Sequence, residues 1–161
     1  MTEIHSAEAA RVAADRYRRE LVGFDPELGD WAAAEPGEPV LVHTLAREPS
    51  YWLVPLEGAA GLVGFVRVSG DGEPVAGGRL GGGSASAPHV VTWITAEQAV
   101  ERAQAEADPE AVIARPLYVH DGPPGREGWL VDVREPDGRC HTLLVTRGGA
   151  SAVRGAAGTL E

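Results

Sequence analysis

The chain has almost no cysteine. Cys140 is the only one among its 161 residues, so no internal disulfide can form and the framework of a small disulfide-rich secreted domain is excluded. A chain of this length buries about 70% of the surface that it exposes when unfolded, so stability requires neither a disulfide nor a structural metal.

Positive charge is scarce. Lysine is absent, and 14 arginines stand against 24 acids, which gives a formal net charge of −10 with more acids than arginines in both halves of the chain. Clustered positive charge is what holds nucleic acids and anionic membrane surfaces, so both are disfavoured as partners. We interpret the acidity as a feature that keeps the protein soluble.

Long hydrophobic runs are also missing. The longest apolar runs, such as Trp52–Leu56, are far shorter than the roughly 20 residues needed to cross a bilayer. The N-terminus begins acidic and leads into an arginine-bearing helical pattern, without the apolar stretch or the small-residue cleavage site of a secretory signal. We therefore expect a cytoplasmic protein that does not contact a membrane.

The chain does contain one pattern twice. Alanine-rich helical stretches begin at Ser6 and, 89 positions later, at Thr95. Both residues are predicted N-caps, and Gln98 completes a capping box with Thr95. Each helical stretch is followed by β-type runs that end near an Asp-Gly pair, at residues 71–72 and 137–138. This repetition indicates a duplicated module.

We predict an α+β fold of two repeats, each with one helix packed on a three- to four-stranded antiparallel sheet. In the first helix one stripe is expected to face the sheet, formed by Ala9, Val12, Ala13, Tyr17 and Leu21. The predicted strands are 40–45, 51–56, 62–68 and 74–80 in the first repeat, and 112–119, 129–134 and 140–146 in the second, with a fringe at 151–154. The repeats occupy residues 1–80 and 92–161, and the Gly/Ser-rich segment 81–91 is a predicted joint.

The second half resembles the PepSY domain family. The resemblance is carried by the helix 95–103, the strand 129–133, the Pro136-Asp137-Gly138 turn and the strand 142–145, and it covers about residues 92–155. The first half is a more divergent copy, and its segments 51–55 and 64–68 also resemble cystatin-like propeptide modules. The resemblance implies a helix followed by a three-stranded meander, and a role beside a peptidase-like protein.

Groups that could support catalysis are scattered along the chain. The histidines lack the i, i+4 helical pair or the Cys-x-x-Cys clustering that is typical of zinc sites. Cys140 would need a nearby base such as His120 to become a nucleophile. A trio of Ser50, His120 and Asp121 lacks the Gly-x-Ser-x-Gly context that exposes a nucleophilic serine. We predict no catalytic residue, no metal site and no cofactor.

Two places are predicted to contact a partner. Trp31 lies in an irregular acidic segment, residues 25–39, and is expected to be exposed. The loop 120–128 is longer than a hairpin needs and is stiffened by prolines, which lowers the entropy lost on binding. The contact residues predicted on this loop and on the strand that enters it are Tyr118, His120, Pro123, Pro124 and Arg126. Trp52 and Trp129, in corresponding strands of the two repeats, are expected to share a core role.

The sequence favours a non-catalytic module that binds another protein, as an inhibitor or regulator of a peptidase-like partner where the resemblance applies. The alternative is a small-molecule-binding module that uses the concave face of the sheet, and an enzyme is a third and less favoured hypothesis. A pocket with convergent polar groups would favour the small molecule, whereas an open sheet edge or an exposed tryptophan patch would favour the protein partner.

Overall fold

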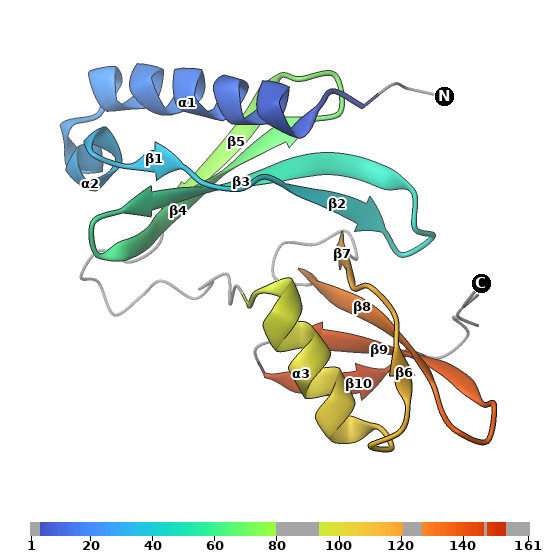
Figure 1. Ribbon diagram of the computed structural model, residues 1–161. Helices are drawn as coiled ribbons and strands as arrows, with labels where there is room; N and C mark the ends of the chain where they lie inside the picture. Colours follow the sequence, from blue (N-terminus) through green and yellow to red (C-terminus); the bar gives the residue numbers. More distant parts are fainter. Residues whose placement is uncertain (1–3, 80–93, 121–126, 147, 154–161) are drawn as a thin grey trace. The chain divides into compact units, whose positions relative to one another are not determined.

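The computed structural model describes residues 4–79, 94–120, 127–146 and 148–153 (Figure 1). Its contacts divide the chain into two units. Unit 1 consists of Met1–His43 and Glu48–Val90, and unit 2 of Thr44–Arg47 and Val91–Glu161. The predicted joint, 81–91, lies outside the described residues.

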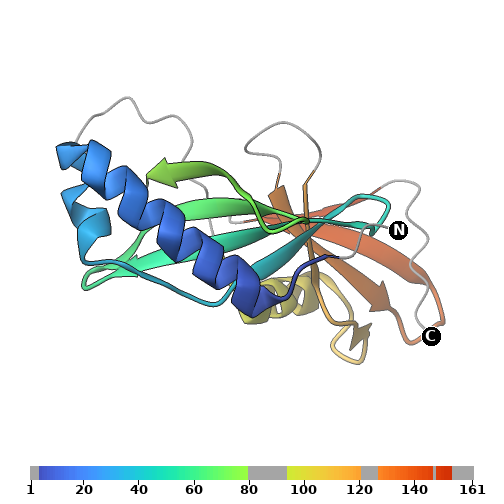
Figure 2. The ribbon, with the colours of Figure 1, turned by 90° about the horizontal axis from the view of Figure 1, so that it is seen from above.

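Unit 1 is a helix-covered antiparallel sheet. Its elements are α1 (Ala7–Phe24), a 3-10 turn η1 (Pro26–Leu28), α2 (Gly29–Ala32), β1 (Glu35–Pro36), β2 (Val40–Thr44), β3 (Pro49–Gly58), β4 (Gly61–Ser69) and β5 (Pro74–Arg79). The sheet order is β2-β3-β4-β5, and β1 pairs with β3. Figures 1 and 2 show α1 running across one face of these strands.

Unit 2 repeats this order of elements. It contains α3 (Ala96–Glu106), β6 (Val112–Ile113), β7 (Leu117–His120), β8 (Glu127–Arg134), β9 (Cys140–Thr146) and β10 (Gly149–Ala152). The order is β7-β8-β9-β10, and the short β6 pairs with β8 as β1 pairs with β3 in unit 1. In both units, therefore, a helix is followed by a two-residue strand and then by four longer ones.

The predicted fold of one helix on a separate small sheet in each repeat is wrong. All ten strands of the described residues belong to a single hydrogen-bonded sheet, five from each unit, and the three α-helices are a smaller part of the structure. The segment predicted as one strand from 112 to 119 is divided into β6 and β7, because Pro116 interrupts it. None of the helices in the described part of the chain is long and apolar enough to cross a membrane.

The predicted helix starts are confirmed. The Ser6 hydroxyl accepts a hydrogen bond from the Ala9 amide at 3.2 Å. Thr95 and Gln98 form the reciprocal capping box, with distances of 3.2 and 3.0 Å. The Asp-Gly turns are confirmed as well, because the second residue of each, Gly72 and Gly138, has the positive φ that favours glycine.

A tryptophan holds the start of each helix. The Trp52 indole N–H donates to the carbonyl of His5, and the Trp129 indole N–H donates to the carbonyl of Ile94, both at 2.8 Å. In each unit the acceptor is the residue just before the N-cap. The expected core role holds fully for Trp129, which is buried, and in part for Trp52, which is half-buried against the core of unit 1.

The core of unit 1 lies between α1 and the sheet. It is formed by Ala10, Ala13, Ala14, Trp31, Ala34, Val54, Leu56, Val66 and Val68. The alanines let the helix backbone lie close to the strands, as the composition predicts. The predicted stripe is displaced around the helix, however, because Val12 is 61% exposed and Ala10 and Ala14 are fully buried instead.

Candidate functional site

Trp31 is buried, and the expectation that it is exposed is wrong. Its side chain is 1% exposed, and its ring lies directly on two glycines of the sheet. A Cβ atom on Gly64 would lie 2.7 Å from the indole, and one on Gly77 would lie 2.9 Å from it. The two glycines of β4 and β5 therefore form a flat slot for the ring, and Trp31 is an anchor of unit 1.

Arg18 holds the segment that carries this tryptophan. One guanidinium nitrogen, Nη1, donates to the carbonyls of Trp31 and Ala32, at 2.7 and 3.1 Å. Nε and Nη2 donate to Asp15, at 3.1 and 2.7 Å. The side chain is almost completely buried. Arg18 thus binds the carbonyls at the end of the four-residue helix α2, where the Trp31 carbonyl also accepts a hydrogen bond from the Ala34 amide at 3.2 Å.

The predicted contact residues of unit 2 are only partly within the described chain. Tyr118 on β7 is buried and packs edge-on against Trp129, with ring centroids 4.9 Å apart. His120, at the end of β7, is half-buried. Pro123, Pro124 and Arg126 lie outside the described residues, so the role of their loop stays a prediction. Tyr118 belongs to the core of unit 2.

Of the residues weighed for catalysis, Cys140 begins β9, Ser50 lies in β3 and His120 ends β7. Cys140 is exposed, and its Sγ lies 3.9 Å from the carbonyl oxygen of Gly138. Asp121 lies outside the described residues. Within the described ranges, no three or more His, Cys, Asp or Glu side chains are grouped so that they could hold a metal ion.

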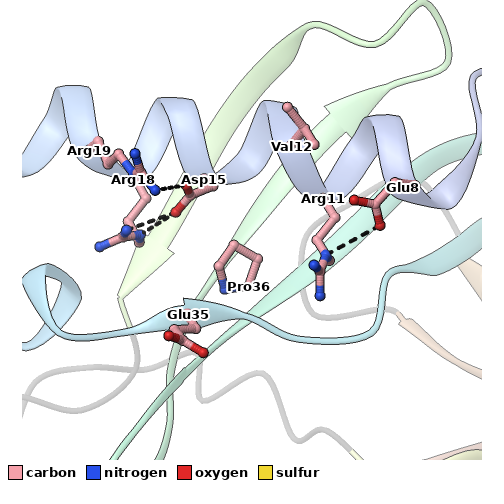
Figure 3. Close-up of a pocket in the computed structure, with 8 residues that line it drawn as sticks. All are labelled: Glu8, Arg11, Val12, Asp15, Arg18, Arg19, Glu35 and Pro36. Atoms are coloured by element: carbon pink, nitrogen blue, oxygen red, sulfur yellow. Dashed lines mark hydrogen bonds and ion pairs between the residues drawn. The ribbon is translucent and has the colours of Figure 1, made fainter.

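A shallow charged cleft lies between α1 and β1 (Figure 3). Its volume is about 350 Å³, and it is lined by Glu8, Arg11, Val12, Asp15, Arg18, Arg19, Glu35 and Pro36. Arg11 pairs with Glu8 at 3.4 Å, and Arg18 and Arg19 both pair with Asp15, at 2.7 and 2.6 Å. The arginines are therefore already satisfied by acids of their own helix, and they do not converge on a free position that a ligand could occupy.

Unit 2 contains an ion pair with a buried carboxylate that the sequence analysis missed. Asp132 of β8 accepts two hydrogen bonds from the Arg47 guanidinium, at 2.8 and 2.7 Å, and one from the Thr142 hydroxyl at 2.6 Å. Burial raises the pKa of Asp132, but the hydrogen bonds from Arg47 and Thr142 outweigh it, and the pKa is lowered overall. The signal was present, since an acid in the middle of an apolar strand requires a partner.

Among the described residues of unit 1, β5 is an edge strand of the sheet. Among the described residues it pairs on one side only, with β4, and it is the last strand of the sheet. Its sequence, Pro-Val-Ala-Gly-Gly-Arg, has little side-chain bulk, and five of its six residues are exposed. An exposed edge presents backbone N–H and C=O groups that another strand can bond.

The pairing register shows which backbone groups face outward. The carbonyl of Pro55 accepts from the Gly37 amide at 2.8 Å, on the side of β3 away from β4. Its partner Phe65 therefore turns its backbone toward β5, where it faces Gly78. Because this direction alternates along a strand, Gly78 and Ala76 bond to β4, and Gly77 and Arg79 point their N–H and C=O groups to the open edge.

Comparison of the chain with protein-family models, with curated proteins and with solved structures finds no match. The resemblance to PepSY domains therefore stays a hypothesis drawn from the sequence. What can be argued about function comes from the geometry of the two units.

Proposed function

We propose that this protein is a non-catalytic module that binds another protein. The observation that carries the proposal is the open edge of β5, where a strand of small, exposed residues leaves backbone donors and acceptors facing outward. Sheet edges of this kind recognise partners through main-chain hydrogen bonds and need no deep pocket.

The charged cleft gives little support to a small-molecule role. The charged cleft between α1 and β1 is shallow, and its arginines are paired with Glu8 and Asp15. Ligand pockets usually combine an enclosed apolar surface with a few convergent polar groups, whereas this cleft is open and lined mostly by charged side chains. The idea that the partner is peptidase-like, and that this protein inhibits or regulates it, comes from the sequence resemblance and is part of the proposal.

The test is to recover what binds the protein in its native cell extract. Immobilised protein should retain a protein partner at close to one-to-one stoichiometry, measured by native mass spectrometry after mild elution. The partner should then be assayed for peptidase activity with and without this protein. A retained small molecule with no retained protein would contradict the proposal, and an unaffected peptidase or a partner without such activity would reject the regulatory part alone.

A further inference from the structure

We propose that the open edge of β5 takes an extended, apolar segment of the partner as an additional strand, with a bulky side chain seated beside Gly77. This inference rests on the proposed function and specifies its binding mode. Gly77 and Arg79 supply the outward-facing backbone groups that would bond the added strand, as their register with β4 shows.

The length of the added strand is limited at one end. A register shift between Arg67 and Val68 of β4 places an irregularity in β5 between Pro74 and Ala76, and Pro74 has no N–H to donate. The regular part of the edge is therefore Ala76–Arg79. Only a short segment can pair there, so side-chain contacts must supply much of the affinity.

The helix side of this edge offers such a contact. Gly77 has no side chain, and the ring of half-buried Tyr17 comes within 3.0 Å of the position that its Cβ would occupy. A residue bonded opposite Gly77 would point to the same side of the sheet and lie beside this ring. On the other side, a Cβ on Gly78 would have open space, with no atom within 4 Å. The face on which Gly78 lies therefore has room for a large side chain, and on the helix side an incoming side chain would contact the Tyr17 ring.

The charges at the edge favour an uncharged segment. Arg79 pairs with Asp30 at 3.2 Å, and Glu73, just before β5, lies 3.8 Å from Arg16. Each charged group at the ends of the strand thus has an opposite charge from the helical layer. Because these charges are already paired, a charged residue in the added strand would gain less from them than from free charges, whereas an apolar residue would bury surface against Tyr17.

The probes for the test are eight-residue synthetic peptides with blocked ends. In each peptide threonine alternates with one other residue type, which is leucine, phenylalanine, glycine, aspartate or arginine. Binding is measured by fluorescence anisotropy. We expect the leucine and phenylalanine peptides to bind at least about tenfold more tightly than the glycine, aspartate and arginine peptides, since a buried side chain of this size contributes more than one factor of ten.

Amide-resolved hydrogen exchange then locates the contact. In the free protein the amides of Ala76 and Gly78 should be protected and those of Gly77 and Arg79 should exchange quickly. Binding of the leucine peptide should slow hydrogen exchange at the amides of Gly77 and Arg79 and leave the exchange rates of Ala76 and Gly78 unchanged. Protection at other strands, with Gly77 and Arg79 unaffected, would overturn the proposal.

A matched pair of variants separates the backbone contact from the side chain. Arg79→Pro removes an outward N–H without removing a bond to β4, whereas Arg79→Ala removes the same ion pair and keeps the N–H. Because it loses one backbone hydrogen bond, Arg79→Pro should bind the leucine peptide about tenfold more weakly than Arg79→Ala does. Equal binding by the two variants would refute strand addition.

Gly78→Lys provides a second variant in case proline disturbs β5, because the fold has space for its side chain and an edge lysine opposes strand pairing. It should also weaken the leucine peptide. A native partner that binds wild-type protein and Gly78→Lys equally would reject this mode and leave the proposed function intact. Absence of any protein partner would reject both.

Discussion

Trp31, Gly64 and Gly77 act together at the scale of single residues. The tryptophan is the largest fully buried side chain of the described chain, and it fits only because two strand positions beneath it have no Cβ. Glycine in a strand normally costs stability, so its presence here is explained by the close approach of the ring.

Gly64→Ala should therefore destabilise the protein. The new Cβ would lie 2.6 Å from the backbone oxygen of Gly78 and 2.7 Å from the indole, and neither neighbour is a flexible side-chain end. We expect a loss of about 1–3 kcal/mol in the free energy of unfolding, measured by urea denaturation. Gly78→Ala is the matched control, since its Cβ meets nothing. Equal effects of the two substitutions would show that the slot is not tight.

Asp132 gives a prediction about pH. Its folded-state pKa lies below the ordinary carboxyl value, so its contribution to stability is present above that ordinary value and is lost as the pH falls through the folded pKa. The difference in unfolding free energy between wild type and Asp132→Asn should thus be largest near pH 7 and should shrink below about pH 4. Asp108→Asn, at an exposed position, provides the control. A difference that does not change with pH would contradict the assignment.

At the scale of elements, the two helices share a device at their starts. A tryptophan from the middle of the sheet donates to the carbonyl just before each N-cap, from β3 to α1 and from β8 to α3. The contact at α3 is buried, whereas the one at α1 is exposed to water, which can replace the lost donor.

Trp129→Phe should consequently cost more than Trp52→Phe. The first substitution leaves a buried carbonyl without its donor, at about 1–3 kcal/mol, and the second should cost less than about 1 kcal/mol beyond the change in packing. Thermal and urea unfolding measure both. A cost of Trp129→Phe that does not exceed the cost of Trp52→Phe would contradict the role of these bonds.

The sequence predicted elements well where the determinants are local. The caps at Ser6 and Thr95, the two Asp-Gly turns and the bounds of β9 all follow from a few neighbouring residues. The short strands β1 and β6 could not be predicted, because two residues show no alternation. Trp31 was misjudged for a related reason: its burial depends on glycines more than thirty positions away, which no local pattern reveals.

At the scale of the whole molecule, the number of sheets could not be read from the sequence. Alternation of apolar residues indicates which segments are strands, but it does not show which strands are neighbours. The prediction of two separate small sheets rests on the sequence repeat alone. The ion pair of Asp132 and Arg47 could not be read from the sequence either, since the two residues lie 85 positions apart.

The net charge of −10 predicts how the open edge behaves in solution. At neutral pH, repulsion between acidic molecules should keep copies apart, and this repulsion fades as the pH falls toward zero net charge. Light scattering should then show self-association that Gly78→Lys reduces and Gly78→Ala does not, because a lysine opposes edge pairing. Equal association of both variants would place the contact elsewhere on the surface.

The glycine slot also constrains how this sequence can diverge. The side chains at positions 31, 64 and 77 compete for the same space, so substitutions at the three positions are coupled. In a related sequence with a small residue at position 31, positions 64 and 77 could carry larger side chains. In one that keeps the tryptophan, both positions should remain glycine. Joint variation at these three positions is therefore a signature by which distant relatives of unit 1 could be recognised even after its helical and strand patterns have been rewritten.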